Sequence, residues 1–283
     1  MKPAEFSYEK PSSLEGLLKL LDQPDRDYQV LAGGQSLMPM MNFRLAQPEL
    51  LIDMNAVEEL QFISEEGEAV QIGAMTRYAQ LASSPLVAKY LPLFAMALPH
   101  IAHAAVRNRG TIGGSAALAD PAAEMPALLL VLNAALNLVS NSGQRSVAAD
   151  DFFLGIYETA LEEGEIIQSI SIPKTQAGNR YGFYELARRH GDYAMAGVAI
   201  AAGADDPVED IRIAMFGIAD RACRINAAEQ AFGGTSLADG AALDAAIAGL
   251  STLEFQGDLN ADAATKKHLA GVVLKRALKE MSK

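Results

Sequence analysis

The chain has 283 residues and is 50% hydrophobic, so it can bury substantial cores, and its length favours two or three compact units over one. Its 35 acidic side chains against 23 basic ones give a formal charge of -12, which disfavours attraction to polyphosphate, so no nucleic acid is expected as a partner. One cysteine, Cys223, and no Cys/His cluster of metal-site spacing predict no metal in this chain and place any redox metal on another one.

The first predicted unit spans residues 1–55 and mixes one helix with strands. Residues 12–23 combine a Ser cap, an early Glu and apolar residues at helical spacing, which predicts a helix. Residues 28–33 and 49–57 are apolar runs typical of buried strands, and a glycine-bearing segment separates them.

The second predicted unit spans residues 56–175. Residues 64–68, with the sequence SEEGE, indicate an acidic turn before a strand at 69–76. The Ala-rich segment 77–106 predicts two helices broken around Pro92 and Pro99. After a second glycine-bearing segment, the pattern predicts a helix over 124–134, a hairpin over 136–149 and an alternating strand over 165–173.

The third predicted unit spans residues 176–283. A polar stretch at 174–179 forms a linker, and the apolar runs 180–187, 196–205 and 211–220 predict three strands followed by Ala-rich helices. Mixed helices and strands throughout predict an α+β fold. No leader segment and no uncharged run near the roughly 18 to 20 residues that span a bilayer are found, so we expect a cytoplasmic protein without a transmembrane segment.

Two segments share one device, an apolar residue followed by paired glycines and a small hydroxyl residue. They are LAGGQSLM at 31–38 and TIGGS at 111–115. Exposed N–H groups at such turns can converge on an anion, because glycine permits positive φ and leaves room for a phosphate. Two cradles suit a pyrophosphate, although each glycine pair alone is also typical of an ordinary turn. Neither segment fits the Rossmann fingerprint or the P-loop.

The segments 31–54 and 107–129, together with YELARRHGDYAMAGVAI at 184–200, resemble the FAD-binding (medium) subunits of molybdenum hydroxylases. That family includes the medium subunit of carbon monoxide dehydrogenase and the flavin domain of xanthine dehydrogenase. The resemblance covers essentially the whole chain. It implies a two-subdomain FAD-binding fold of the vanillyl-alcohol oxidase (PCMH) type, followed by a smaller α+β domain.

By this resemblance, residues of both glycine segments wrap the FAD pyrophosphate. They are Leu31, Ala32, Gly33, Gly34, Gln35, Ser36, Leu37, Met38, Thr111, Ile112, Gly113, Gly114 and Ser115. Histidine often precedes the position of Ala119 in relatives, where this chain has Leu118, so a polar contact from that site is in doubt.

Four further positions follow from the same resemblance. Glu124 is the first choice and Asp120 the second for a carboxylate on the ribose of the adenosine half, and either acid can instead cap a helix beginning at Pro121. Tyr193 matches an aromatic residue near the isoalloxazine, with a buried core tyrosine as the alternative. Ile167 matches a position whose backbone approaches the flavin.

The resulting hypothesis is an FAD-binding electron-transfer subunit with no catalytic side chain of its own. It implies a small iron–sulfur subunit, a large molybdopterin subunit and a terminal acceptor, whether quinone, NAD or oxygen. Two alternatives stay open at this point. One is a free-standing FAD-dependent oxidoreductase, which needs an acid–base residue over the ring. The other is a non-catalytic scaffold or sensor whose flavin site has decayed.

Overall fold

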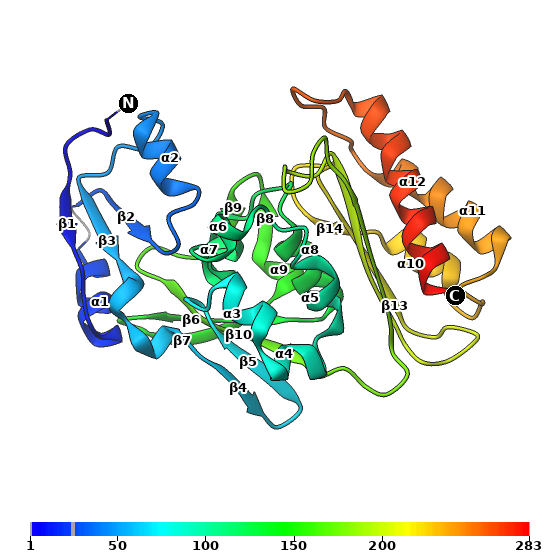
Figure 1. Cartoon of the computed structure of the whole chain (residues 1–283), viewed down its shortest axis with the longest axis horizontal. Coiled ribbons are helices and arrows are strands. Elements are labelled where there is room, and N and C mark those ends of the chain that lie inside the picture. The colour runs from blue at the N-terminus through cyan, green and yellow to red at the C-terminus, as the bar shows by residue number, and fades with distance from the viewer. Residues whose placement is uncertain (1, 24–25, 283) are drawn as a thin grey trace.

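The computed structural model describes residues 2–23 and 26–282 and arranges them in three groups along one axis. Figure 1 shows the N-terminal elements at one end, a second sheet with its helices in the centre, and the C-terminal strands and helices at the other end. The expected mixture of helices and strands is confirmed in each group.

The N-terminal group is built around a parallel sheet of order β1-β3-β2. Its strands are β1 (Ser7–Glu9), β2 (Tyr28–Leu31) and β3 (Leu50–Asp53), with helices α1 (Leu14–Leu21) and α2 (Leu37–Asn42) in the connections and 3-10 turns at Met54–Ala56 and Glu58–Leu60. The predicted serine cap is confirmed, since Ser13 Oγ accepts from the Gly16 N–H at 3.1 Å. Parallel neighbours need such crossovers, which leave the β2–α2 connection at one edge of the sheet.

The central group holds an antiparallel sheet of order β4-β5-β10-β6-β7. Its strands are β4 (Ile63–Glu66), β5 (Ala69–Gly73), β10 (Ile166–Pro173), β6 (Ala135–Ser140) and β7 (Gly143–Ala148), and a short pair joins β8 (Phe153–Gly155) to β9 (Glu158–Thr159). The acidic turn expected at 64–68 is wrong in its first half, because Ser64–Glu66 belong to β4 and pair with β5. Acidic residues on an edge strand keep it from pairing with other chains, and here they resemble turn residues.

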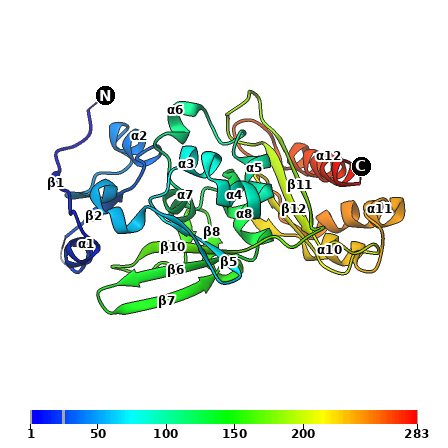
Figure 2. The same cartoon turned by 60° about the horizontal axis from the view of Figure 1, so that its bottom comes forward.

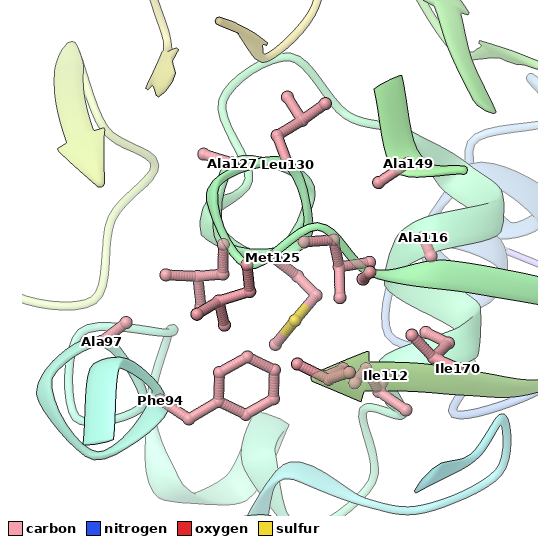
Figure 3. Close-up of a cluster of buried hydrophobic side chains, with 14 of the residues drawn as sticks. Phe94, Ala97, Ile112, Ala116, Met125, Ala127, Leu130, Ala149 and Ile170 are labelled. Atoms are coloured by element: carbon pink, nitrogen blue, oxygen red, sulfur yellow. The ribbon is translucent and has the colours of Figure 1, made fainter. Parts of the chain in front are cut away.

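Helices cover one face of this sheet. They are α3 (Tyr78–Ser83), α4 (Pro85–Tyr90), α5 (Pro92–Ala97), α6 (Ala104–Arg107), α7 (Ile112–Leu118), α8 (Glu124–Val131) and α9 (Ala149–Phe152). The two helices expected over 77–106 are four. The expected break at Pro92 is confirmed, but Pro85 also stands in a first turn, where proline begins a helix, and the short helix α6 comes after Pro99. Helix α8 is buried over its whole length. Figure 3 shows Met125 projecting from α8 toward Phe94 and Ile112.

The C-terminal group is an antiparallel sheet of order β11-β12-β13-β14, formed by β11 (Arg180–Leu186), β12 (Ala196–Ala202), β13 (Ile211–Phe216) and β14 (Cys223–Arg224). Helices α10 (Asn226–Phe232), α11 (Gly240–Gly249) and α12 (Ala263–Met281) follow, with a 3-10 turn at Leu250–Thr252. α12 crosses the outer face, as Figure 2 shows, and no helix of residues 2–23 and 26–282 is long and apolar enough to cross a membrane.

Strand β12 is buried on both faces. Because successive side chains point to opposite faces of a strand, each face packs against a different core. Val198 and Ile200 belong to the core under α10 and α12, while Ala199 and Ala201 belong to the core that contains α8. Small side chains on the second face let α8 approach the sheet closely. The C-terminal group therefore packs directly against the central group. Its β11–β12 connection reaches the cavity described below, which N-terminal elements also line.

Candidate functional site

The first glycine segment is a turn between β2 and α2. Gly34 has φ +72°, in the left-handed region that a side chain disfavours. Two side chains brace the turn: Gln35 Nε2 donates to the Gly33 carbonyl at 3.1 Å, and Asn55 Nδ2 donates to the Ala32 carbonyl at 2.8 Å. Among the described residues, no protein acceptor faces the N–H groups of Gly34, Gln35 and Ser36, so this turn can present main-chain donors to an anion.

The second glycine segment has a different backbone from the one expected. Gly113 and Gly114 lie in the first turn of α7, and neither has a positive φ. Thr111 caps this helix, and its Oγ1 accepts from the Gly114 N–H at 3.1 Å. The expectation of free amides in both segments is wrong here, because the protein already uses the N–H groups of Ile112, Gly113, Gly114 and Ser115.

The glycines bring the two segments into contact. A Cβ added at Gly33 would overlap the Arg109 carbonyl oxygen and stand 2.8 Å from Gly110 Cα, while one added at Gly114 would lie 3.2 Å from Ala32 Cβ. A Cβ at Gly113 would stand 2.7 Å from the Ala74 carbonyl oxygen. Absence of side chains therefore serves close packing of backbone on backbone at these positions. Both segments, although far apart in the chain, reach the same place.

That place is a cavity of about 660 Å³, within the range of sites that bind small molecules and cofactors. The predicted residues that line it are Ala32, Gly33, Gly34, Gln35, Ser36, Leu37, Thr111, Gly113, Gly114, Ser115, Asp120, Glu124, Ile167 and Tyr193. Leu31, Met38 and Ile112 are not among the lining residues, and Ile112 is completely buried in the central core. The cavity thus gathers residues from all three groups of elements.

Many residues of the cavity wall were not predicted from the sequence. Further lining residues include Tyr28, Val30, Met40, Met54, Ala74, Tyr78, Ile101, Ala102, Leu161, Glu162, Glu163, Gly164, Glu165, Gly191 and Asp192. The apolar ones are ordinary core-type residues in the sequence, and the stretch 161–165 has the composition of a surface turn. Only their position beside the glycine segments marks them, so no local pattern could have identified them.

Asp120, Tyr157 and Tyr193 meet at the mouth of the cavity. Asp120 does not cap α8, because the helix begins at Glu124 with Ala123 in the cap position. Its Oδ1 instead accepts from the Ala122 N–H at 2.9 Å, and Tyr157 donates to its Oδ2 at 3.4 Å. Tyr193 is 60% exposed, which excludes a buried core tyrosine. Desolvation, followed by the charge of Asp120, raises the pKa of Tyr193 to about 12.

Glu124 is a buried acid in the cavity wall, with 8% of its surface exposed. Burial raises the pKa of Glu124 to about 7; the charges of Glu185 and Asp120 act in the same direction, and His100 acts against them. Tyr78 lies against the same region, and burial raises the pKa of its phenol as well. A carboxyl group with this pKa exchanges its proton near neutral pH.

Ile167 lies where β10 departs from regular pairing. Its register with β6 shifts between Ile167 and Ser169, which marks a β-bulge beside the cavity. Ile167 is 4% exposed, belongs to the central core and lines the cavity.

Comparison with known proteins decides the family. The FAD binding domain in molybdopterin dehydrogenase matches residues 4–175, and the CO dehydrogenase flavoprotein C-terminal domain matches residues 181–281. This chain belongs to the flavoprotein subunits of the molybdopterin dehydrogenases. FAD is the cofactor of this family's binding domain, and the cavity fits it, with main-chain donors at one glycine turn and apolar walls nearby.

Individual relatives of this flavoprotein agree along nearly their whole length. The chain is 43% identical to the carbon monoxide dehydrogenase medium chain of Hydrogenophaga pseudoflava, with 98% of this chain and 97% of that one covered. It is 40% identical to the nicotine 6-hydroxylase medium subunit of Paenarthrobacter nicotinovorans, covering 99% and 98%. A structure of the Hydrogenophaga pseudoflava enzyme lacking the Mo-pyranopterin moiety superposes with a TM-score of 0.96 at 44% identity, covering 99% and 98%.

Proposed function

We propose that this flavoprotein is the electron-transfer subunit of a molybdenum hydroxylase complex. In such a complex a large molybdopterin subunit supplies electrons to iron–sulfur clusters on a small subunit. This chain takes the electrons from those clusters and passes them to a terminal acceptor such as quinone, NAD or oxygen. The observation that carries the proposal is the meeting of both glycine segments at one cavity, in a chain that matches the family over residues 4–175 and 181–281. Relatives named as medium subunits of such enzymes support the partners.

The FAD pyrophosphate is held mainly by the first segment in this proposal. The unpartnered N–H groups of Gly34, Gln35 and Ser36 donate to phosphate oxygens, and Gln35 keeps the turn closed through its bond to Gly33. The second segment contributes the hydroxyl groups of Thr111 and Ser115 and a surface that fits the turn. No lysine or arginine is needed, because main-chain dipoles supply the positive potential.

For the acids Asp120 and Glu124 we propose a contact with a different part of FAD from the adenosine ribose expected from the sequence. Asp120 and Tyr193 interact at the cavity mouth. Glu124 lies near Tyr78, and the charges of both Glu124 and Tyr193 act on the Tyr78 phenol. If Tyr193 marks the isoalloxazine, both acids lie toward the flavin end. We therefore assign Asp120 to the ribityl hydroxyls in place of the adenosine ribose, and Glu124 to the region of the ring.

Bound FAD supplies the redox chemistry, and the chain holds and orients it. The apolar walls exclude water, which strengthens the hydrogen bonds from the turn to the phosphates. The bulged backbone at Ile167 and the phenol of Tyr193 limit the positions open to the ring. We also infer the PCMH type of fold and units at 1–55, 56–175 and 176–283, supported by the three sheets. A cytoplasmic location stays a prediction.

Purification of the chain alone, followed by reduction, tests this function. We expect a yellow protein that binds FAD and is reduced by the matching reduced iron–sulfur subunit, but not by organic donors in its absence. Turnover of an organic donor by the isolated chain would instead support a free-standing oxidoreductase. A folded chain that binds no FAD would support the scaffold alternative.

A further inference from the structure

The connection between β11 and β12 carries Tyr193 to the mouth of the cavity. Gly191, Asp192 and Tyr193 of this connection line the cavity, and Tyr193 is 60% exposed. An exposed aromatic side chain on a loop is not fixed by a core of its own. Its position therefore depends on the contacts that hold the loop.

The connection between α5 and α6 packs against this loop. A Cβ added at Gly191 would stand 2.7 Å from His103 Cε1 and 3.0 Å from the Ala102 carbonyl oxygen, so the two connections are in close contact. Arg107 Nη1 donates to the carbonyls of Ile101 at 2.9 Å and Ala102 at 2.7 Å, which fixes the backbone on this side. Ile101 and Ala102 also line the cavity, so the contact is part of the cavity wall.

One ion pair joins the same two regions. His100, in the connection after α5, has its Nδ1 3.4 Å from Oε1 of Glu185, near the end of β11. The side chain of Glu185 is 5% exposed, and its Oε2 has no hydrogen-bond partner among the residues that the structure describes. The ring of His100 also lies 5.9 Å from that of His190, the neighbour of Gly191. Because a buried carboxylate is costly when its charge is not compensated, a protonated His100 stabilises this junction more than a neutral one.

Glu185 dominates the charge around His100. Its hydrogen bond and then its charge raise the pKa of His100 above the ordinary 6.5, burial opposes this, and the charge of Glu124 adds to it. The other titratable group beside the ring is His190, and Phe183 is an apolar neighbour. Since the pKa is raised in the folded chain, the ion pair contributes its full stabilisation below about pH 6.5 and loses it as the pH rises through the raised value.

We propose that His100 is a positioning residue for Tyr193, and that protonation of its ring strengthens FAD binding. A charged His100 compensates Glu185 and holds the end of β11, with the loop that follows, against the central group. A neutral His100 leaves the carboxylate charge uncompensated, and the loop that carries Tyr193 loosens. Proton binding and FAD binding are therefore linked, with tighter FAD binding at lower pH. This inference rests on the proposed function, which puts Tyr193 beside the flavin.

Hydrogen exchange tests the ion pair in the full-length chain without FAD. The matched variant is His100→Gln, which keeps a side-chain N–H donor but has no ring that titrates. At about pH 6 we expect the amides of residues 185–195 to exchange on the order of fivefold faster in the variant, because a charge-assisted hydrogen bond is replaced by a neutral one. At about pH 8.5 the two chains should exchange equally, since His100 is then neutral. Wild type and variant are measured at the same pH, so intrinsic exchange rates cancel.

FAD titration by fluorescence tests the link to Tyr193. The affinity of the wild type should exceed that of His100→Gln on the order of fivefold at about pH 6, and the two should be equal at about pH 8.5. In a Tyr193→Ala background the same substitution should have no effect, because His100 acts through Tyr193. Glu124 titrates in all these chains, so its contribution cancels. His268→Ala, on the exposed face of α12, is the matched control and should bind FAD like the wild type at both pH values.

The outcomes separate this inference from the proposed function. Equal FAD affinity of wild type and His100→Gln at about pH 6 would overturn it, and so would the same loss at both pH values, which a merely structural contact would give. A loss that persists in the Tyr193→Ala background would show that His100 does not act through Tyr193. If His100→Gln does not fold, NMR titration decides, because the pKa of the His100 ring should be lower in Glu185→Gln than in the wild type. A wild-type chain that binds no FAD would overturn the proposed function instead.

Discussion

The two glycine segments carry nearly the same residues and have different structures. In 31–38 the pair forms a turn with Gly34 at φ +72°, whereas in 111–115 it forms the first turn of a helix capped by Thr111. The first turn leaves its N–H groups without protein acceptors, and the second has its N–H groups in use. The two similar motifs therefore have different roles. Segment 31–38 presents main-chain N–H donors, and segment 111–115 provides the surface against which the turn that carries those donors packs.

The difference teaches that a glycine pair has two separate physical uses. At Gly34 the absence of a side chain permits a backbone conformation, while at Gly33, Gly113 and Gly114 it permits contact with Arg109, Ala74 and Ala32. From the sequence, both pairs were expected to form turns in which glycine permits positive φ and leaves room for a phosphate. Variants that add a single methyl group can separate the two uses.

Gly113→Ala should have the largest effect on folding. Its methyl group would meet the backbone of Ala74, with the carbonyl oxygen at 2.7 Å and Cα at 2.8 Å, and neither can move without distorting β5 or α7. We expect a loss of about 3 kcal/mol in the free energy of unfolding, measured with urea. Gly240→Ala, where an added Cβ meets nothing, is the control and should be nearly neutral. Equal stability of the two variants would contradict the packing role.

Glu124→Gln should change how stability depends on pH in the FAD-free chain. The pKa of Glu124 is about 7 in the folded chain and ordinarily 4.5, as in the unfolded chain, so between these limits the unfolded chain releases a proton that the folded chain keeps. The free energy of unfolding therefore falls as pH rises through this window, by up to roughly 3 kcal/mol, and is flat above it. Urea unfolding at about pH 5 and about pH 7.5 should show a smaller fall in the variant. An identical fall in the free energy of unfolding of the variant and the wild type would show that the Glu124 carboxyl group is exposed to water.

Gly34→Ala should combine a moderate loss of stability with a large loss of FAD affinity. A non-glycine residue in the left-handed region costs about 1–2 kcal/mol, and the new Cβ would stand 3.0 Å from Leu31 Cδ1. Relieving that strain moves the donors of the turn. Gly34→Asn should recover part of the stability, since asparagine tolerates this conformation. Urea unfolding and FAD titration by fluorescence measure both effects, and unchanged affinity would show that the turn is not the phosphate site.

Thr111→Ala should have the smallest effect. It removes the cap bond to the Gly114 N–H, so we expect a loss of about 1 kcal/mol in stability, with Thr111→Ser close to the wild type. The comparison further predicts that FAD affinity falls less than in Gly34→Ala. A larger fall in FAD affinity for Thr111→Ala than for Gly34→Ala would show that the second segment, and not the first, contributes most to FAD binding.

Local patterns predicted the elements with strong signals. Helix α1 with its Ser13 cap, the β6–β7 hairpin and strand β10 all follow from periodicity and turn residues. Strand β4 was missed because Glu65 and Glu66 on an edge strand resemble a turn. Helices α3 and α4 were merged because Pro85, which begins α4, was not recognised as the start of a helix. Such cases depend on which neighbour a segment pairs with, and composition does not record that.

By itself the sequence determined the family, the cofactor and the residues of the two glycine segments, because these depend on residue types at short spacing. Tertiary structure alone decided which amides are free, since Thr76 and Ala74 reach the second segment only in the fold. It also decided that Asp120 lies beside Tyr193, and that His100 Nδ1 stands 3.4 Å from Glu185 Oε1. Hydrogen bonding and desolvation are set by neighbours in space, and these neighbours are far apart along the chain.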